Sequence, residues 1–273
     1  MTQSALRPLR WLFAIGGLAA VLAANAQTSD ADLMQTRHKF QTQLTRQAEL
    51  GYLLYLPPGY DAQAAKRWPL LLFLHGSGER GTNLALVAVH GPPKLVKKNP
   101  PVPKNETPES RGSREAASRM LAENFILVSP QCPSGQSWDS EVLLRLLDSV
   151  IASHKVDSGR VYLTGLSMGG FGSWALLAQA PERFAAVAPI CGGGNSIDIL
   201  LSAREKAAAL KSLPVWAFHG AKDPVVQVTE SERMVALLKK AGVKEVELTI
   251  YPAANHDSWT ATYNNPKLYE WFL

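Results

Sequence analysis

Residues 161–180 contain the pattern that most restricts what this chain can fold into. An apolar run at 161–164 leads into Gly165-Leu166-Ser167-Met168-Gly169, and an apolar helix-like stretch follows at 171–180. A strand, a sharp turn with a serine at its tip and a helix make up the arrangement called the nucleophile elbow. The glycines on either side of the serine lack a Cβ, so the strand and the helix can pass close to each other. We therefore expect Ser167 to project from a strand end, beside the free N–H groups of a helix N-terminus.

The alternative is an ordinary glycine-rich turn between a strand and a helix, because Gly-x-Ser-x-Gly also occurs by chance. Apolar runs elsewhere in the chain favour the elbow. Runs that are apolar on both faces indicate central parallel strands covered by helices. These central strands are predicted at 70–74, 125–128, 161–166, 185–190, 215–218 and 246–251, and two earlier strands are predicted at 40–46 and 50–56.

Helical patterns lie between these runs. Apolar residues recur at helical spacing from 142 to 151, after Asp139 or Ser140 as the capping residue. Thr229 and Glu232 form a capping-box pattern that opens another helix, and Gly242 stands where a glycine would end it. This alternation predicts an α/β fold of the α/β-hydrolase type, a mostly parallel central sheet flanked by helices.

One segment interrupts the alternation. Residues 99–114 are rich in proline, charged and polar side chains, and they are predicted to be an exposed insertion between two main strands. The insertion is expected to be either a tolerated surface loop or a lid that contacts substrate.

Three residues with the chemistry of nucleophilic catalysis stand at the ends of predicted strands. A serine needs a base within hydrogen-bond reach, and the base needs a carboxylate to orient it. Asp223 follows the run at 215–218, and His256 follows the run at 246–251. The order Ser167, Asp223, His256 is that of an α/β-hydrolase, whose parallel strands end at one rim. We predict Ser167 as nucleophile, His256 as base and Asp223 as orienting acid.

Other histidines and acids fit these roles less well. His75 and His219 stand at strand ends, where each is expected to brace a neighbouring loop. Asp257 adjoins the predicted base but is expected to point elsewhere, and Asp198 is the weaker alternative for the acid. The histidines without a matching context are His38, His90 and His154.

Acyl transfer also requires hydrogen-bond donors for the oxyanion of the tetrahedral intermediate. The backbone N–H of Met168, directly after the nucleophile, is one expected donor. The other is expected in His75-Gly76-Ser77-Gly78, at the N–H of Ser77 or, as the next choice, of Gly78.

The first 26 residues resemble a secretory signal peptide. Arg7 and Arg10 precede an apolar stretch at 11–24, and Ala24-Asn25-Ala26 is a small-x-small cleavage pattern. The alternative is a membrane anchor, but the stretch is short and no basic stop-transfer cluster follows. Cleavage would leave 247 of the 273 residues, 27–273, as a single catalytic domain that is periplasmic or secreted. The two lost arginines leave 26 basic and 23 acidic side chains, a charge of +3 that does not indicate nucleic-acid binding.

Cys132 and Cys191 are the two cysteines of the chain. Export would permit a disulfide, but the strands that they follow need not be neighbours. We expect two unpaired, buried thiols rather than a disulfide. Neither cysteine has metal-ligand spacing to a histidine, so no metal is predicted.

Five segments carry a resemblance to a known family: 74–81 (Leu-His-Gly-Ser-Gly-Glu-Arg-Gly), 129–133 (Ser-Pro-Gln-Cys-Pro), 165–170 (Gly-Leu-Ser-Met-Gly-Gly), 218–223 (Phe-His-Gly-Ala-Lys-Asp) and 255–259 (Asn-His-Asp-Ser-Trp). Across 49–273 the chain resembles secreted bacterial serine esterases of the α/β-hydrolase superfamily, in the phospholipase/carboxylesterase-like branch. This group is related to feruloyl and acetyl esterases and to prolyl-oligopeptidase-like hydrolases. The resemblance implies hydrolysis of carboxylic esters through an acyl-enzyme, without a cofactor. It disfavours a dienelactone hydrolase, which would normally carry cysteine at position 167.

Two tryptophans are candidates for substrate contact. Trp138 follows the run at 125–128, and Trp259 lies three residues beyond His256. Aromatic rings near a site suit sugar rings or aromatic acyl groups, although tryptophans at a sheet rim often belong to the core. The predicted function is that of an exported serine carboxylesterase whose substrate is a small-molecule or polysaccharide-linked ester, such as an acetyl or feruloyl ester. The alternatives are a serine peptidase of the prolyl-oligopeptidase type and a non-catalytic binding protein on a hydrolase scaffold.

Overall fold

The computed structural model describes residues 39, 41, 46–102 and 105–273. The chain divides into two units, 1–46 and 47–273, and the helices and strands given below belong to the second. The predicted signal peptide and most of the strand expected at 40–46 lie outside the described residues.

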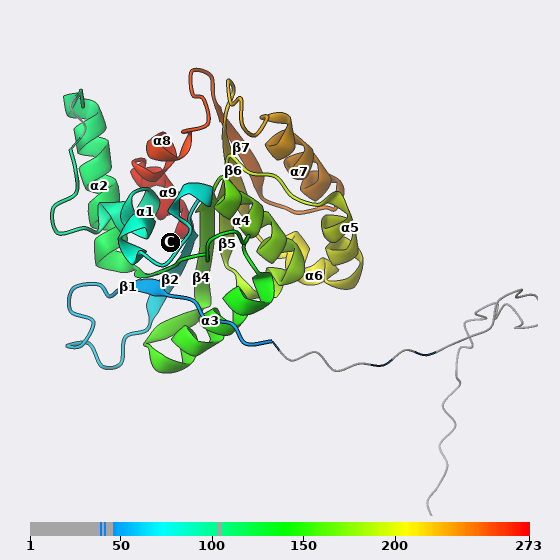
Figure 1. Ribbon diagram of the computed structural model, residues 1–273, viewed down its shortest axis with the longest axis horizontal. Coiled ribbons are helices and arrows are strands. Elements are labelled where there is room, and N and C mark those ends of the chain that lie inside the picture. The colour runs from blue at the N-terminus through cyan, green and yellow to red at the C-terminus, as the bar shows by residue number, and fades with distance from the viewer. Residues whose placement is uncertain (1–38, 40, 42–45, 103–104) are drawn as a thin grey trace, which may run out of the picture. The chain divides into compact units, whose positions relative to one another are not determined.

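The centre of the second unit is a sheet whose order is β1-β3-β2-β4-β5-β6-β7 (Figure 1). Only the edge strand β1 is antiparallel, against β3, and the other neighbours are parallel. The mostly parallel sheet predicted from the apolar runs is therefore confirmed. The strands are β1 (Tyr52–Tyr55), β2 (Trp68–Leu74), β3 (Ile126–Pro130), β4 (Val156–Leu166), β5 (Ala186–Ile190), β6 (Val215–Gly220) and β7 (Val246–Tyr251).

Helices cover both faces of the sheet, because successive side chains of a strand point to opposite faces. On one face, Leu70 and Leu72 of β2 belong to a core shared with Trp174. The helices that pack on this face are α3 (Ser140–Ser153), α4 (Met168–Gln179), α5 (Ser196–Glu205), α6 (Ala207–Ser212) and α7 (Thr229–Lys240).

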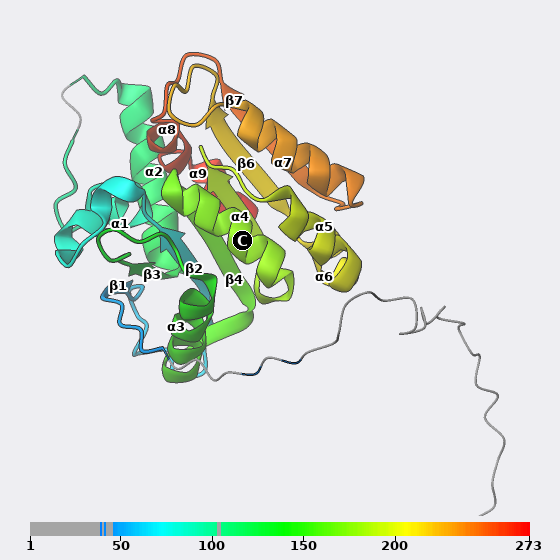
Figure 2. The same ribbon diagram turned by 45° about the vertical axis from the view of Figure 1, so that its right-hand side comes forward.

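On the other face, Leu71 and Phe73 of the same strand pack in a second core with Tyr263. Figure 2 shows α4 in front of the sheet and α8 and α9, in red, behind it. The helices of this second layer are α1 (Gly91–Leu95), α2 (Pro108–Asn124), α8 (Trp259–Tyr263) and α9 (Pro266–Phe272). Among the described helices, none combines the length and the apolar character that a bilayer span requires.

The strand order fixes where a ligand can bind. After β2 the chain places β3 on one side of β2 and β4 on the other, so the direction of winding reverses there. The loops that leave two such strands diverge and open a crevice at their carboxyl ends. Residues 75–80 follow β2, and Ser167 follows β4.

The segment predicted as an exposed insertion, 99–114, differs from that expectation in its second half. Residues 108–114 are the first turns of α2, which opens with Pro108 after Thr107, whose side chain accepts a hydrogen bond from the N–H of Ser110. Arg114 is buried and forms hydrogen bonds of 2.7 and 3.0 Å with both carboxylate oxygens of Glu106. The polar composition of this helix arises because only a narrow stripe, including Ala117 and Leu121, faces the core.

The signals at the ends of two other helices had mixed outcomes. Asp139 caps α3 through its side chain, and Gly242 ends α7 with a φ of +82°, both as predicted. The capping box at Thr229 was wrong, because Val228 occupies the N-cap position and makes no side-chain capping bond.

The close crossing of α4 over β2 gives a stability prediction. A Cβ on Gly169 would lie 1.9 Å from the backbone oxygen of Leu74, so neither element can relax without moving the other. Gly169→Ala is expected to lower the free energy of unfolding by about 3 kcal/mol or more, or to prevent folding. Gly112→Ala in α2 adds a Cβ with nothing within 4 Å of it. This substitution should instead raise the free energy of unfolding by up to about 1 kcal/mol. Urea denaturation of both variants measures these changes in the free energy of unfolding. Equal changes in the two variants would contradict the close crossing of α4 over β2 as their cause.

Candidate active site

Three loops at the carboxyl end of the sheet carry the residues of the candidate site. Ser167 lies between β4 and α4, Asp223 follows β6, and His256 follows β7. Parallel strands place these three loops along the same rim.

The turn at Ser167 is forced by the close passage of backbone around it. A Cβ on Gly165 would lie 2.3 Å from the backbone oxygen of Gly169, so only glycine fits where β4 and α4 cross. Ser167 has a φ of 53° and a ψ of −117°, a conformation that costs a non-glycine residue roughly 1–3 kcal/mol. Its N–H donates to the carbonyl of Ile190 at 3.0 Å, and its carbonyl accepts from Phe171 at 3.0 Å. These bonds hold the serine hydroxyl above the strand end.

A continuous hydrogen-bond series joins the three side chains. The Nε2 atom of His256 lies 2.9 Å from the Oγ of Ser167, and its Nδ1 atom lies 2.7 Å from the Oδ2 of Asp223. An ionised carboxylate can only accept, so Nδ1 carries a proton and Nε2 is free to accept the proton of the serine. This is the arrangement in which a histidine can act as a base toward a hydroxyl.

Asp223 is held by its own loop. Its Oδ1 atom accepts hydrogen bonds from the N–H groups of Val225 at 2.8 Å and Val226 at 2.9 Å. Burial would raise the pKa of Asp223, but the hydrogen bonds from His256 and from these two N–H groups bring the pKa below its ordinary value. The carboxylate therefore remains ionised beside the imidazole.

His219 and His75 occupy structural positions. His219 is fully buried, with Nε2 2.8 Å from the carbonyl of Val226 and Nδ1 2.7 Å from the hydroxyl of Ser231, so it supports the Asp223 loop. The Nε2 of His75 accepts from the N–H of Cys132 at 2.9 Å, and its Nδ1 donates to the carbonyl of Gly76 at 2.6 Å. Burial lowers the pKa of His75, which keeps this ring neutral while it braces the loop after β2.

The carboxylates of the two alternative acids, Asp257 and Asp198, form hydrogen bonds with other residues than His256. Asp257 accepts hydrogen bonds at 2.9 Å from both the N–H and the hydroxyl of Thr260. Asp198 lies in the first turn of α5, where its carboxylate is bonded to Asn195 at 3.3 Å.

The two expected oxyanion donors border the serine. Met168 is the first residue of α4, so its N–H has no acceptor within the helix. In the loop after β2, Ser77 opens a short 3₁₀ turn, η2 (Ser77–Glu79), directly after Gly76. The position of a Cβ on Gly76 would lie 3.6 Å from the Cβ of Ser167, which shows how closely this loop approaches the nucleophile turn.

The two candidate tryptophans differ in what they contact. The indole N–H of Trp138 donates to the backbone carbonyl of His75 at 3.2 Å. The centroids of the Trp138 and His75 rings are 4.7 Å apart. Trp138 therefore supports the loop after β2. Trp259 instead places the edge of its ring against His256, at 5.3 Å between centroids and 89° between planes.

Sequence reasoning missed two residues close to this site. The neighbour of Glu79 in the sequence, Arg80, donates to the carbonyls of Ser77 and Gln136. Glu79 instead lies with its Oε1 atom 3.9 Å from Nε2 of His90. His90 showed no motif, and only the packing of α1 beside α8 brings it to Trp259.

The two cysteines are unpaired and buried, as predicted. Cys191 follows β5 with a φ of 40°, and burial raises the pKa of its thiol to about 12. Burial also raises the pKa of Cys132, although the positive charge of Arg80 opposes this effect. Both thiols therefore stay protonated at neutral pH.

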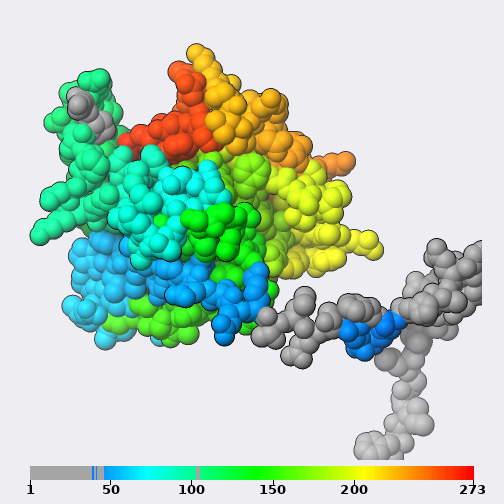
Figure 3. Space-filling view, viewed as in Figure 1, coloured from blue at the N-terminus to red at the C-terminus, as the bar shows by residue number. Residues whose placement is uncertain are grey.

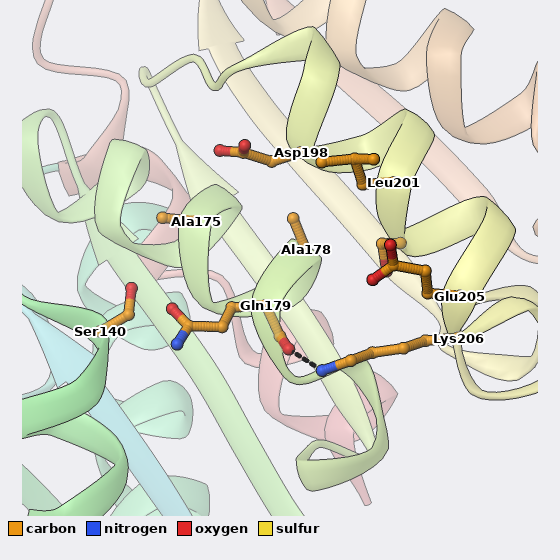
Figure 4. Close-up of a pocket in the computed structure, with 9 residues that line it drawn as sticks. Ser140, Ala175, Ala178, Gln179, Asp198, Leu201, Glu205 and Lys206 are labelled. Atoms are coloured by element: carbon orange, nitrogen blue, oxygen red, sulfur yellow. Dashed lines mark hydrogen bonds between the residues drawn. The ribbon is translucent and has the colours of Figure 1, made fainter. Parts of the chain in front are cut away.

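A surface hollow of about 480 Å³ lies between α4 and α5, apart from the candidate site. Figure 4 shows Asp198, Leu201 and Glu205 facing Ala178 and Gln179 across it. Lys206 donates to the backbone carbonyl of Gln179. None of the three residues of the hydrogen-bond series lines this hollow.

Comparison with known proteins gives a family match. A family model described as the dienelactone hydrolase family matches residues 34–267. A bifunctional acetylxylan esterase/xylanase from Neocallimastix patriciarum is 29% identical over 118 residues, which are 41% of this chain and 16% of that protein. The chain therefore corresponds to a small part of that relative.

Two solved structures share the fold. One described as a thermostable esterase is 28% identical, with a TM-score of 0.62, over 82% of this chain and 59% of that one. One described as a ferulic acid esterase is 16% identical, with a TM-score of 0.59, over 82% of this chain and 90% of that one. At the latter identity the likeness concerns the fold alone.

The lowered pKa of Asp223 makes a prediction about stability and pH. Because the pKa is lower in the folded protein, the ionised carboxylate stabilises the fold above its unfolded pKa of about 4. This contribution is lost as the pH falls through the folded pKa. Asp223→Asn should lower the free energy of unfolding by about 1–3 kcal/mol at pH 7, with a smaller difference at pH 3.

Urea denaturation at the two pH values measures this effect. The exposed Asp61 provides a control, because Asp61→Asn should change stability by less than about 0.5 kcal/mol at either pH. A loss for Asp223→Asn that is as large at pH 3 as at pH 7 contradicts the charged hydrogen bonds described above.

Proposed function

Because the chain belongs to the dienelactone hydrolase family of α/β-hydrolases, we propose that it is a serine-dependent hydrolase of carboxylic esters. The sequence argument against this family was wrong. It rested on the expectation of cysteine at position 167, whereas the family match extends over residues 34–267 with serine at that position. The match reflects the sequence pattern across residues 34–267, which does not depend on the identity of one side chain at the turn.

The hydrogen-bond series carries the proposal. The 2.9 Å contact from Ser167 Oγ to His256 Nε2 places the base where it can take the hydroxyl proton as the oxygen attacks the ester carbonyl. The 2.7 Å contact to Asp223 keeps Nδ1 protonated and stabilises the imidazolium that forms. His256 then gives its proton to the departing alcohol oxygen, which leaves an acyl group on Ser167. A water molecule, deprotonated by His256, hydrolyses this acyl-enzyme in the second half of the cycle.

The backbone amides of Met168 and Ser77 are proposed to stabilise the oxyanion. Met168 has a free N–H at the positive end of α4, and the loop of Ser77 closes on the same turn from β2. Trp138 and His75 keep that loop in place through their hydrogen bonds.

The proposed substrates are esters of short acyl or hydroxycinnamoyl groups, in small molecules or on polysaccharides. The edge of Trp259 against His256 places an aromatic surface beside the proposed base. A relative described as a bifunctional acetylxylan esterase/xylanase supports this class.

Removal of the nucleophile tests the mechanism. Ser167→Ala should lower kcat for 4-nitrophenyl acetate and for methyl ferulate by roughly 10³-fold or more, because the proposed acyl-enzyme forms on the Ser167 hydroxyl. Ser202 supplies a matched control: it lines the hollow between α4 and α5, so Ser202→Ala should keep kcat within about twofold. Substantial activity in Ser167→Ala, or its loss in Ser202→Ala, would place the nucleophile elsewhere.

The protonated thiols give a second test. Because burial raises the pKa of both cysteines, iodoacetamide at pH 7.5 should alkylate neither in the folded protein and should leave ester hydrolysis unchanged. After denaturation in urea both thiols should react, as counted by mass spectrometry. Inactivation of the folded protein together with alkylation of a cysteine would argue against serine as the sole nucleophile.

A further inference from the structure

The carboxyl group of Glu79 is buried beside the candidate site without a hydrogen-bond donor for one of its oxygens. The residue is 9% exposed, and its Oε2 atom has no hydrogen-bond partner among the described residues. His75 lies 3.9 Å away but already uses Nδ1 for Gly76 and Nε2 for Cys132. A buried carboxylate oxygen is costly when it has no donor, so such an atom points to a group that supplies one.

The unpaired oxygen lies close to the nucleophile. The position of a Cβ on Gly76 would lie 3.2 Å from Oε2 of Glu79 and 3.6 Å from the Cβ of Ser167. The same position lies 2.8 Å from Cδ1 of Leu166, so the Leu166 side chain borders it as well, and Oε2 of Glu79 is at most 6.8 Å from the Cβ of Ser167. A donor bound next to Ser167 is therefore within reach of Glu79.

Aromatic rings connect Glu79 with the proposed base. Trp259 contacts His256 at 5.3 Å and His90 at 5.4 Å between ring centroids. His90 in turn lies 3.9 Å from the Oε1 atom of Glu79. Glu79, His90 and Trp259, which we name the alcohol wall, therefore form a continuous series from the loop after β2 to His256.

The alcohol wall continues to the surface. A small hollow of about 20 Å³, room for about one water molecule, lies between α1 and α8 and is lined by His90 and Trp259 together with Lys94, Thr260 and Asn264. Figure 3 shows the cyan surface of the segment near residue 90 beside the orange-red surface of the segment near residue 260. An extended group that leaves the site along this wall would meet aromatic and polar side chains in turn.

The reaction places the alcohol part of the ester on this wall. His256 Nε2 must protonate the departing oxygen, so the carbon attached to that oxygen lies next to the neighbours of His256. We propose that the alcohol wall binds the alcohol part and that Glu79 accepts a hydrogen bond from a hydroxyl on the carbon next to the ester-bearing carbon. The inference rests on the ester hydrolysis proposed above, and it identifies the alcohol as polyhydroxylated, as in glycerol or a sugar.

This chemistry agrees with the side chains present. A carboxylate accepts from hydroxyl groups, while the rings of Trp259 and His90 can pack against the C–H faces of a sugar or polyol. An alcohol without the second hydroxyl would leave Oε2 of Glu79 buried and unpaired, which lowers binding of the transition state.

A pair of matched esters tests the proposal on the full chain. Glycerol 1-monobutyrate and propyl butyrate share an acyl group and differ in the hydroxyls of the alcohol. The wild type should show a kcat/KM about tenfold or more higher for the glycerol ester. Glu79→Gln and Glu79→Ala should reduce this ratio at least about threefold, the latter more, because they remove the charged acceptor. The exposed Glu141 gives the control: Glu141→Gln should leave the ratio unchanged.

Each outcome separates this inference from the proposed function. Cleavage of both esters by the wild type without a preference, or a ratio unchanged in the Glu79 variants, overturns the alcohol wall and leaves ester hydrolysis in place. Failure of the wild type to cleave either ester overturns both. If the Glu79 variants do not fold, inhibition of the wild type decides: free glycerol should inhibit more strongly than 1-propanol, and equal inhibition overturns the proposal.

Discussion

The crossing of α4 over the ends of β2 and β4 is the constraint on which the rest of the structure depends. The backbone of Gly169 touches Leu74, and the backbone of Gly165 touches Gly169, at separations that no Cβ would allow. This contact forces Ser167 into a positive φ and directs its hydroxyl out of the sheet. The same contact places the N-terminus of α4 beside the loop after β2, so a nucleophile and two sets of backbone donors border one small space.

The sheet supplies the partners of that serine. β4 lies next to β5, whose Ile190 carbonyl holds the Ser167 N–H, and β6 and β7 follow in order with the loops of Asp223 and His256. Two buried histidines that do not contact the Ser167 hydroxyl, His75 and His219, fix the loops on either side through hydrogen bonds to backbone groups. The geometry at the rim is therefore set by backbone contacts. Substitution of His75 or His219 should affect the site by moving the loop that each histidine holds.

Much of this arrangement could be predicted from the sequence, because it depends on local signals. The six apolar runs from 70–74 to 246–251 became the parallel strands of the sheet, and the resemblance to α/β-hydrolases is confirmed by the family match. Residues 108–114 were wrongly taken as part of an insertion, since the helix there buries so narrow a stripe that its composition resembles a loop. The contacts of Trp138, Glu79 and His90 could not be predicted, because they join segments distant in sequence whose packing no periodicity encodes.

The most direct test of the central claim is the position of the acyl group during turnover. The protein would be mixed with 4-nitrophenyl butyrate, quenched in acid within the first turnover, digested and mapped by mass spectrometry. The account predicts a butyryl group on the peptide that contains Ser167, absent from Ser167→Ala and more abundant in a variant whose deacylation is slowed. A butyryl group on another residue, or turnover of the ester with no acylated peptide at any time, would contradict the account.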